Sequence, residues 1–271
     1  NQGLAHVTEP VVMFPDDDSF WYPDTAEELM RAYEADVNER YGAISATDVY
    51  ELPGTSDAEV PVRRIRLTNV PAVMAVRNAL EAWLIPQPFN LYGLERISAL
   101  GPAAATDGLG YPLVASIGGY RMSFRTSLAR RLLFDPVLGS RVGYAIHEDK
   151  DMGLRVLQSG SLIAAVPAAR VFHNQAPGKR AAGYSYGFYQ VFNYLYIARK
   201  VFGDGSRALR ATRRYLAYKT FLYGLRRTDA YDRDVHRGAR AAMSEYETVL
   251  AARPDDLAAL YAELTARHAE G

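Results

Sequence analysis

The stretch "VVMFPDDDSFWYPD", Val11–Asp24, decides how the N-terminal part of the chain folds. It begins with an unbroken apolar run, Val11–Phe14, which predicts a short buried strand. Three consecutive carboxylates follow, those of Asp16, Asp17 and Asp18. Adjacent carboxylates repel one another unless a cation or hydrogen-bond donors offset their charge. Because ligands of α/β sheets gather where strands end, the stretch predicts either a cation-binding turn or a solvated acidic turn.

The segments around this strand alternate between strand and helix patterns, which favours a layered α/β architecture. Pro23 and Asp24 precede a helical pattern over Thr25–Asp36, in which Thr25 and Glu28 fit a capping box. We expect further strands at Ile44–Leu52, Val62–Thr68, Leu113–Ile117, Arg121–Phe124, Leu162–Val166 and Arg170–Phe172, and further helices at Pro71–Leu84 and at Glu148–Ser159, which Gly160 ends.

From about residue 179 arginine, tyrosine and alanine dominate at helical spacing. We therefore expect two domains, residues 1–178 with the sheet and residues 179–271 as a helical C-terminal region. The stretch "ALRATRRYLAYKTFLYGLRR" mixes apolar residues with arginines, so it predicts either a helix packed on the first domain or one lying on an anionic membrane surface. With breaks at "GDGS" and "RPDD", the expected helices are Ala181–Phe202, Ser206–Arg226, Ala230–Ala252 and Asp255–His268.

The composition excludes several classes of protein. The 271 residues carry 31 basic and 31 acidic side chains, so no overall field attracts nucleic acid, and we expect no nucleic-acid partner. There is no cysteine, which excludes disulfide scaffolds and thiolate metal sites. No signal-peptide pattern and no apolar window of about 18 residues is present, so we expect a cytoplasmic protein.

A second acidic cluster lies in "HEDKDMGLRVLQSG", where Glu148, Asp149 and Asp151 begin the expected helix. Carboxylates at a helix N-terminus are stabilised by the helix dipole and by free backbone N–H groups, which explains the cluster without any ligand. A general base, however, needs only to be ionised and within reach of its proton. Asp149 is therefore a candidate base.

His173 ends the segment "AARVFH" directly after an expected strand. A lone histidine at the junction of a strand and a loop is usually structural. Together with the aspartates of the first stretch, however, its imidazole can complete a site for a divalent ion. Sites rich in carboxylate oxygens suit Mg²⁺ or Mn²⁺.

Four motifs in order, "FPDDDSFWYPD", "GGYRMSFRTSL" with "FDPVLG", "HEDKDMGLRVLQSG" and "VPAARVFH", resemble the family 2 glycosyltransferases, which have the GT-A fold. In that family an aspartate-rich metal motif ends a strand, an "ED-x-D" helix supplies the catalytic base, and a histidine follows a later strand. The resemblance covers about residues 1–174. It implies part of a GT-A-like mixed sheet flanked by helices, followed by the helical region.

The resemblance also implies roles for individual residues. Asp16 and Asp18 match the positions that meet the ribose–diphosphate and the metal, with Asp18 as the direct ligand. Asp17 lies between them and is implied in donor binding. Asp149 matches the base, and His173 matches a histidine that ligates the metal in some members. The residues implied in acceptor binding or in supporting the site are Glu148, Asp151, Arg125 and Trp21.

The activity that the resemblance implies is inverting glycosyl transfer that depends on Mn²⁺ or Mg²⁺. The donor is a nucleoside-diphosphate sugar of the UDP or dTDP type, and the acceptor is a hydroxyl of a glycan or of a lipid-linked molecule. Bacterial cell-surface polysaccharide synthesis at the inner face of the membrane is the implied setting. Two alternatives stay open: a metal-dependent phosphohydrolase, and an interaction domain without catalysis in which the acidic runs are solvated.

The family pattern begins with a nucleotide-binding segment to which nothing here corresponds, since this chain opens at "NQGLAH". A sheet without those strands would expose an edge. We therefore expect this chain to be inactive and poorly stable by itself, and a chain extended at its N-terminus to bind the donor better.

Overall fold

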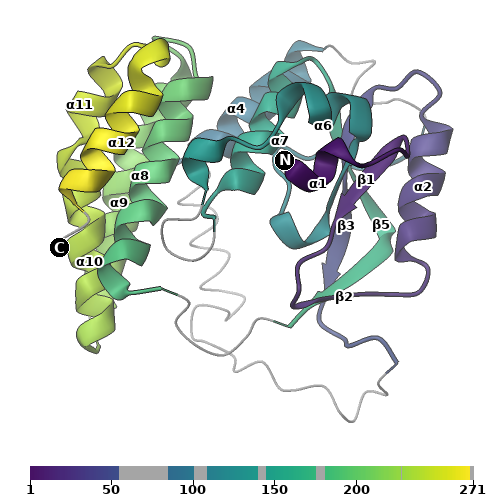
Figure 1. The fold of residues 1–271 in the computed structure, drawn as a ribbon, viewed down its shortest axis with the longest axis horizontal. Helices are drawn as coiled ribbons and strands as arrows, with labels where there is room; N and C mark the ends of the chain where they lie inside the picture. The colour runs from purple at the N-terminus through teal and green to yellow at the C-terminus, as the bar shows by residue number, and fades with distance from the viewer. Residues whose placement is uncertain (55–84, 101–108, 140–144, 175–180, 227, 269–271) are drawn as a thin grey trace. The chain divides into compact units, whose positions relative to one another are not determined.

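The structure of the protein is a computed structural model that describes residues 1–54, 85–100, 109–139, 145–174, 181–226 and 228–268. It confirms a mixed α/β architecture in which a five-stranded sheet is followed by C-terminal helices (Figure 1).

Two compact units make up the chain, and each is built from separated segments. Two segments that precede residue 178 belong to the helical unit, and the division falls within helices α4 (Pro88–Ala99) and α7 (Glu148–Gln158). The sheet unit comprises Asn1–Leu84, Gly93–Phe134 and Met152–Pro177, and the helical unit comprises Ile85–Tyr92, Asp135–Asp151 and Gly178–Gly271.

The sheet has the strand order β1-β4-β3-β5-β2. Strands β3 and β5 are parallel, while the pairs β1–β4, β4–β3 and β5–β2 are antiparallel. The strands expected at residues 11–14, 44–52 and 121–124 correspond to β1, β3 and β4, with shifts at their ends. The strands are β1 (Val11–Phe14), β2 (Ser19–Trp21), β3 (Tyr41–Val49), β4 (Met122–Arg125) and β5 (Leu162–His173).

Helices cover both faces of this sheet. Side chains alternate between the faces along a strand, so Ala43 packs with α6 (Thr126–Leu132) and α7, while Ile44 packs against α2 (Thr25–Ala35). Figure 1 shows α2 on one side of the sheet and α6 and α7 on the other. The core of the unit therefore consists of two apolar layers separated by the sheet.

Strand β5 is continuous, although we expected two strands, Leu162–Val166 and Arg170–Phe172. The residues between them, Pro167–Ala169, bulge out, because Val166 and Arg170 pair with adjacent residues of β3. Proline has no N–H to donate to the ladder, so a bulge at this point leaves the pairing intact on either side. The Thr47 hydroxyl donates to the carbonyl of Val166 at 3.0 Å and helps to close the gap.

The strand expected at Leu113–Ile117 does not form. Only Leu113 makes a bridge, to Ala164 of β5, and the preceding Pro112 has no N–H with which to extend it. The chain then enters a short 3-10 helix, η2 (Gly119–Arg121), before β4 begins. The strand expected at Val62–Thr68 and the helix expected at Pro71–Leu84 lie outside the described residues.

The predicted capping box of α2 is wrong. Asp24 is the N-cap residue, and its side chain makes no capping hydrogen bond. The Thr25 hydroxyl instead donates to the carbonyl of Arg170 in β5. The carboxylate of Glu28 accepts a hydrogen bond from Arg31 one turn further along the helix. A tertiary contact has thus replaced the local one, which sequence spacing alone does not reveal.

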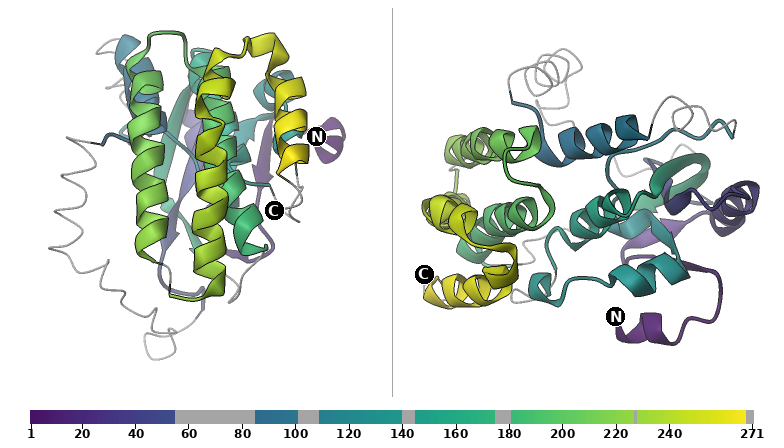
Figure 2. Two further views of the ribbon diagram at one scale, coloured as in Figure 1. Left: turned by 90° about the vertical axis from the view of Figure 1, so that its left-hand side faces the viewer. Right: turned by 90° about the horizontal axis from the view of Figure 1, so that it is seen from above.

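Three long helices of the helical unit, α8 (Gly183–Val201), α9 (Arg207–Leu225) and α10 (Ala230–Ser244), run side by side (Figure 2). They confirm the predicted helical region. None of the helices in the described part of the chain combines the length and the apolar run that crossing a bilayer requires. The remaining elements are α1 (Gln2–Ala5), η3 (Pro136–Leu138), α11 (Tyr246–Ala251), η4 (Pro254–Asp256) and α12 (Leu257–Arg267).

Glycines allow α8 and α10 to approach closely. A Cβ atom at Gly187 would overlap the carbonyl of Val235, and one at Gly238 would overlap the carbonyl of Tyr184. Backbone contact of this kind is open only to a residue without a side chain. The two glycines therefore allow the backbones of α8 and α10 to come into contact.

The helix predicted at Ala230–Ala252 is interrupted at Glu245, so that α10 and α11 are separate helices. Glu245 is buried, and its carboxylate lies 2.9 Å from Nε2 of His268 and 3.5 Å from Arg267. These contacts come from the end of α12 and are invisible in the periodicity of the sequence.

A buried ion pair joins α2 to the sheet. The guanidinium of Arg125 in β4 lies 3.0 Å from the carboxylate of Asp36, with only 13% and 3% of the two side chains exposed. The same carboxylate accepts hydrogen bonds from the backbone N–H groups of Arg40 and Tyr41. Arg125 also donates to the Tyr41 carbonyl at 3.1 Å. One carboxylate therefore fixes the end of α2 and the start of β3.

Replacing Asp36 by alanine should destabilise the sheet unit by about 3–5 kcal/mol, because the guanidinium of Arg125 loses its buried partner and keeps only the exposed carboxylate of Glu39, 3.5 Å away. The free energy of unfolding in urea measures this loss. The matched control is Glu27→Ala, which removes a carboxylate paired with Arg31 on the exposed face of α2. An equal loss of stability in the two variants would contradict this role of Asp36.

Candidate metal centre

The triple aspartate forms a tight turn between β1 and β2. The backbone N–H of Ser19 donates to the Asp16 carbonyl at 3.1 Å, and the Ser19 hydroxyl donates to the same oxygen at 2.7 Å. These bonds close the turn without using the carboxylates. Ser19 and the Asp16 carbonyl therefore fix the shape of the turn.

Pairing of β2 with β5 brings this turn to the histidine. Ser19 lies opposite His173 in the antiparallel ladder, and the N–H of Asn174 donates to the Asp18 carbonyl at 2.9 Å. Asp18 and His173 are 155 residues apart in the sequence. Their neighbourhood therefore follows from the register of the two strands.

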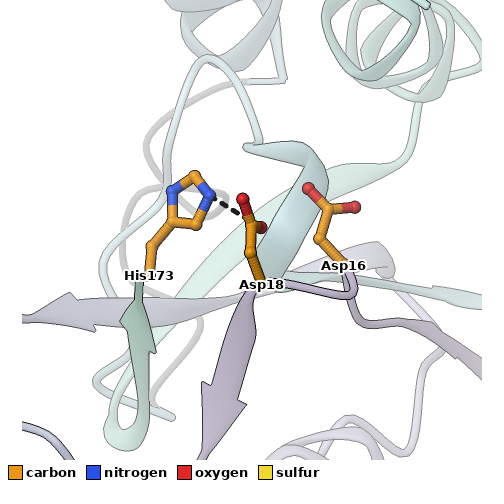
Figure 3. A group of neighbouring side chains, drawn as sticks. All are labelled: Asp16, Asp18 and His173. Carbon is orange, nitrogen blue, oxygen red and sulfur yellow. Dashed lines mark hydrogen bonds and ion pairs between the residues drawn. The ribbon is translucent and has the colours of Figure 1, made fainter. Parts of the chain in front are cut away.

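Asp16, Asp18 and His173 form one group of potential metal ligands (Figure 3). Each offers one ligand atom, and these atoms all lie within 4.8 Å of one another. Nε2 of His173 is 3.1 Å from Oδ1 of Asp18. Asp16 is exposed, whereas the side chains of Asp18 and His173 are only 13% and 17% exposed. The group thus has a sheltered side and a side open to solvent.

The imidazole of His173 is held from its face by Tyr120 of η2. The two rings are stacked, with centroids 4.1 Å apart and an angle of 19° between their planes. Such a contact limits rotation of the imidazole and keeps Nε2 directed at Asp18. The sequence pointed to "GGYRMSFR" as a motif but gave Tyr120 no role in positioning the histidine. Only the fold places its ring over His173.

The ligand set suits a divalent ion that prefers oxygen. Two carboxylates and one imidazole can hold Mn²⁺ or Mg²⁺ and leave further positions for substrate oxygens and water. The carboxylates also lie close enough to repel each other, which a bound cation would relieve. The geometry therefore fits the metal site expected from the sequence.

Other residues expected at this site lie apart from the group. Asp17 is exposed at the turn and is not one of the three potential ligands. Trp21 packs partly against the core layer under α2, and its indole Nε1 is buried without a hydrogen-bond partner. Arg125 is held by Asp36 and by backbone carbonyls of the sheet. Trp21 thus contributes to the core layer under α2, and Arg125 to the buried ion pair with Asp36.

The second acidic cluster begins α7 in the helical unit. Oδ1 of Asp149 accepts the backbone N–H of Lys150 at 2.7 Å, and its Oδ2 lies 3.3 Å from Nζ of Lys150. The side chain of Asp149 is 16% exposed. Glu148 beside it is half-buried. Asp149 thus keeps contact with solvent while its orientation is fixed by its neighbour.

Asp151 is fully buried and anchors α7. Its carboxylate lies 2.6 Å from Nζ of Lys200, which also lies 2.6 Å from Asp135. The Tyr196 hydroxyl donates to Asp135 at 2.9 Å. Burial by itself would raise the pKa of Asp135, but the hydrogen bond and charge of Lys200 outweigh it and hold this pKa below its usual value. This network favours a supporting role for Asp151 over acceptor binding. Lys200 and Tyr196 complete it, and no sequence motif had indicated either residue.

Comparison with known proteins finds no protein-family model and no curated protein that matches the chain.

The chain should bind one Mn²⁺ ion, and Asp18→Asn should weaken this binding about ten-fold or more, because a charged ligand becomes a neutral amide. Titration of Mn²⁺ followed by electron paramagnetic resonance measures the free ion directly. Asp17→Asn is the matched control, since it removes the same charge from the same turn but lies outside the group. Equal affinities in the two variants would show that the turn attracts cations only through its overall charge.

Proposed function

We propose that the protein is an inverting glycosyltransferase that moves a sugar from a nucleoside-diphosphate donor to a hydroxyl group, with the help of Mn²⁺ or Mg²⁺. The observation that carries this proposal is the group formed by Asp16, Asp18 and His173, whose ligand atoms lie within 4.8 Å of one another. The resemblance to family 2 glycosyltransferases supports the same assignment. The donor is of the UDP or dTDP type, and the acceptor is a glycan or a lipid-linked molecule of cell-surface polysaccharide synthesis.

The reaction makes two separate demands on the protein. The bond from the anomeric carbon to the diphosphate oxygen breaks, and that oxygen keeps the electron pair. The chemistry that a divalent ion would supply here is stabilisation of the negative charge on the diphosphate. Asp16, Asp18 and His173 would hold the ion, and the exposed side of Asp16 leaves room for phosphate oxygens.

The second demand concerns the nucleophile. A bond forms between the acceptor oxygen and the anomeric carbon, and the hydroxyl proton must leave at the same time. A carboxylate that is ionised and within reach can accept this proton as general base. Asp149 suits the role because it retains solvent contact and is oriented by Lys150. Asp151 and Lys200 would support it by anchoring the start of α7.

Two variants separate these roles. Turnover is measured with a UDP-sugar donor and Mn²⁺ in the protein as the cell makes it. In this assay Asp149→Asn should lower turnover by about 10²–10⁴-fold, the usual contribution of a general base. It should leave Mn²⁺ affinity unchanged. Asp18→Asn should lose both turnover and Mn²⁺ affinity, while Asp17→Asn should keep the Mn²⁺ affinity.

The products identify the reaction. Release of nucleoside diphosphate together with glycosylation of an acceptor supports transfer, whereas release of inorganic phosphate would support a phosphohydrolase instead. Mn²⁺ binding with no turnover of any sugar nucleotide in the complete protein would contradict the transferase.

We also propose that the protein lies at the inner face of the cell membrane through α9. Residues spaced three or four apart share one helix face, and on α9 such a face exposes Arg207, Arg210 and Arg214, followed by Phe221 and Leu225. The two apolar side chains are 60% and 66% exposed. Arginine is attracted to anionic lipid headgroups, and apolar side chains insert beside it.

Vesicle sedimentation tests this surface. The protein should sediment with vesicles that contain phosphatidylglycerol but not with vesicles of phosphatidylcholine alone, and the double variant Phe221→Ser, Leu225→Ser should bind the anionic vesicles clearly less. Leu133→Ser, at an exposed leucine of the sheet unit, is the control. Unchanged binding by the double variant would contradict a role for the apolar pair.

A further inference from the structure

The helical unit contains a cavity of about 90 Å³, lined by none of the three potential metal ligands. It lies among α8, α9, the start of α4 and the turn before α7. A cavity needs about 10–15 Å³ of such volume to hold one water molecule. This one therefore has room for a group of several heavy atoms, such as a phosphate.

The wall of the cavity is positively charged. Two of the four lysines of the chain, Lys150 and Lys219, line it, and none of the described residues that line it is acidic. Lys150 pairs with Asp149 at 3.3 Å, which offsets part of its charge. Nζ of Lys219 lies 5.8 Å from the ring centroid of Tyr223, another wall residue. An ammonium group beside the face of an aromatic ring is attracted by it, so the wall can hold a positive charge at this point.

His147 is a third basic side chain at the wall of the cavity. Its side chain lines the cavity, and its Nε2 lies 3.1 Å from the Gln190 carbonyl. Burial lowers the pKa of His147, and the charges of Lys150 and Lys219 lower it further against the opposing effect of Asp149.

The backbone at His147 is also unusual. Its φ angle of 70° lies in the left-handed region, which a non-glycine residue rarely adopts. Such conformations persist only where the surroundings hold them, and they cluster at functional sites. His147 directly precedes the first turn of α7, which contains Lys150.

Four Phe and Tyr side chains form much of the rest of the wall, together with Gln87, Gln190, Val191 and Leu216. Tyr194 stacks on Phe89 with ring centroids 3.7 Å apart, and its ring lies 5.2 Å from that of Tyr215. Together with Tyr223 these rings offer flat apolar surface next to the ammonium groups. A ligand that matches the wall therefore joins an anionic group to a flat or apolar group.

We propose that this cavity binds an organic phosphate, with its phosphate at Lys150 and Lys219 and its attached group against the tyrosine rings. The site is distinct from the candidate metal centre, which belongs to the sheet unit, and it requires neither a metal ion nor proton transfer to Asp149. Two ammonium groups supply the charge-assisted hydrogen bonds that phosphate oxygens accept. The rings select against inorganic phosphate, which cannot contact them.

Isothermal titration with phenyl phosphate, in buffer that contains EDTA, tests the site without contribution from the metal centre. The unmodified protein should bind one equivalent, and more tightly than it binds inorganic phosphate. Lys219→Ala should weaken binding about ten-fold or more, as expected for the loss of a charged hydrogen-bond partner. Lys219→Arg should keep most of the affinity, and Tyr215→Leu should reduce the preference for phenyl phosphate over inorganic phosphate.

Arg214→Ala is the matched control, because it removes one positive charge from an exposed position of α9 that does not line the cavity. Circular dichroism establishes that each variant is folded. The proposal is overturned if folded protein does not bind phenyl phosphate, if Lys219→Ala binds it as tightly as the unmodified protein, or if Arg214→Ala weakens binding as much as Lys219→Ala. Equal affinity for inorganic phosphate would overturn the role of the rings.

Discussion

The antiparallel pairing of β2 with the end of β5 is the constraint on which the candidate metal centre depends. It sets Ser19 opposite His173 and brings Asp18 next to the imidazole. Because side chains alternate between the faces of a strand, a shift of one residue in this register would turn His173 away from the turn. The bulge at Pro167–Ala169 belongs to the same constraint, since it sets the register of the last part of β5 against β3.

The two acidic clusters differ in how the fold treats their charges. In the turn, Asp16 is exposed and Asp18 is sheltered, with its Oδ1 3.1 Å from Nε2 of His173. At the start of α7, Lys150 and Lys200 each neutralise one carboxylate. The first cluster is therefore suited to hold a metal ion, and the second to orient a single carboxylate for proton transfer.

Sequence patterns predicted those features that depend on neighbours along the chain. The apolar run of β1, the helix of α7 ended by Gly160 and the helices on either side of "GDGS" all follow from local periodicity and turn residues. The patterns failed where tertiary contacts decide: Thr25 bonds to β5 instead of capping its helix, and Glu245 interrupts a helix. At the site, the motifs indicated the three side chains that the fold brings together, but not the stack of Tyr120 on His173.

The most direct test of the central claim is a crystal structure of the protein soaked in Mn²⁺, with the metal located by its anomalous scattering. A single peak bound by Asp18 and His173, with Asp16 or an ordered water alongside, is the expected result. A peak elsewhere on the chain, or no peak at this turn while the Asp18–His173 hydrogen bond persists, would contradict the assignment of this group as a metal centre.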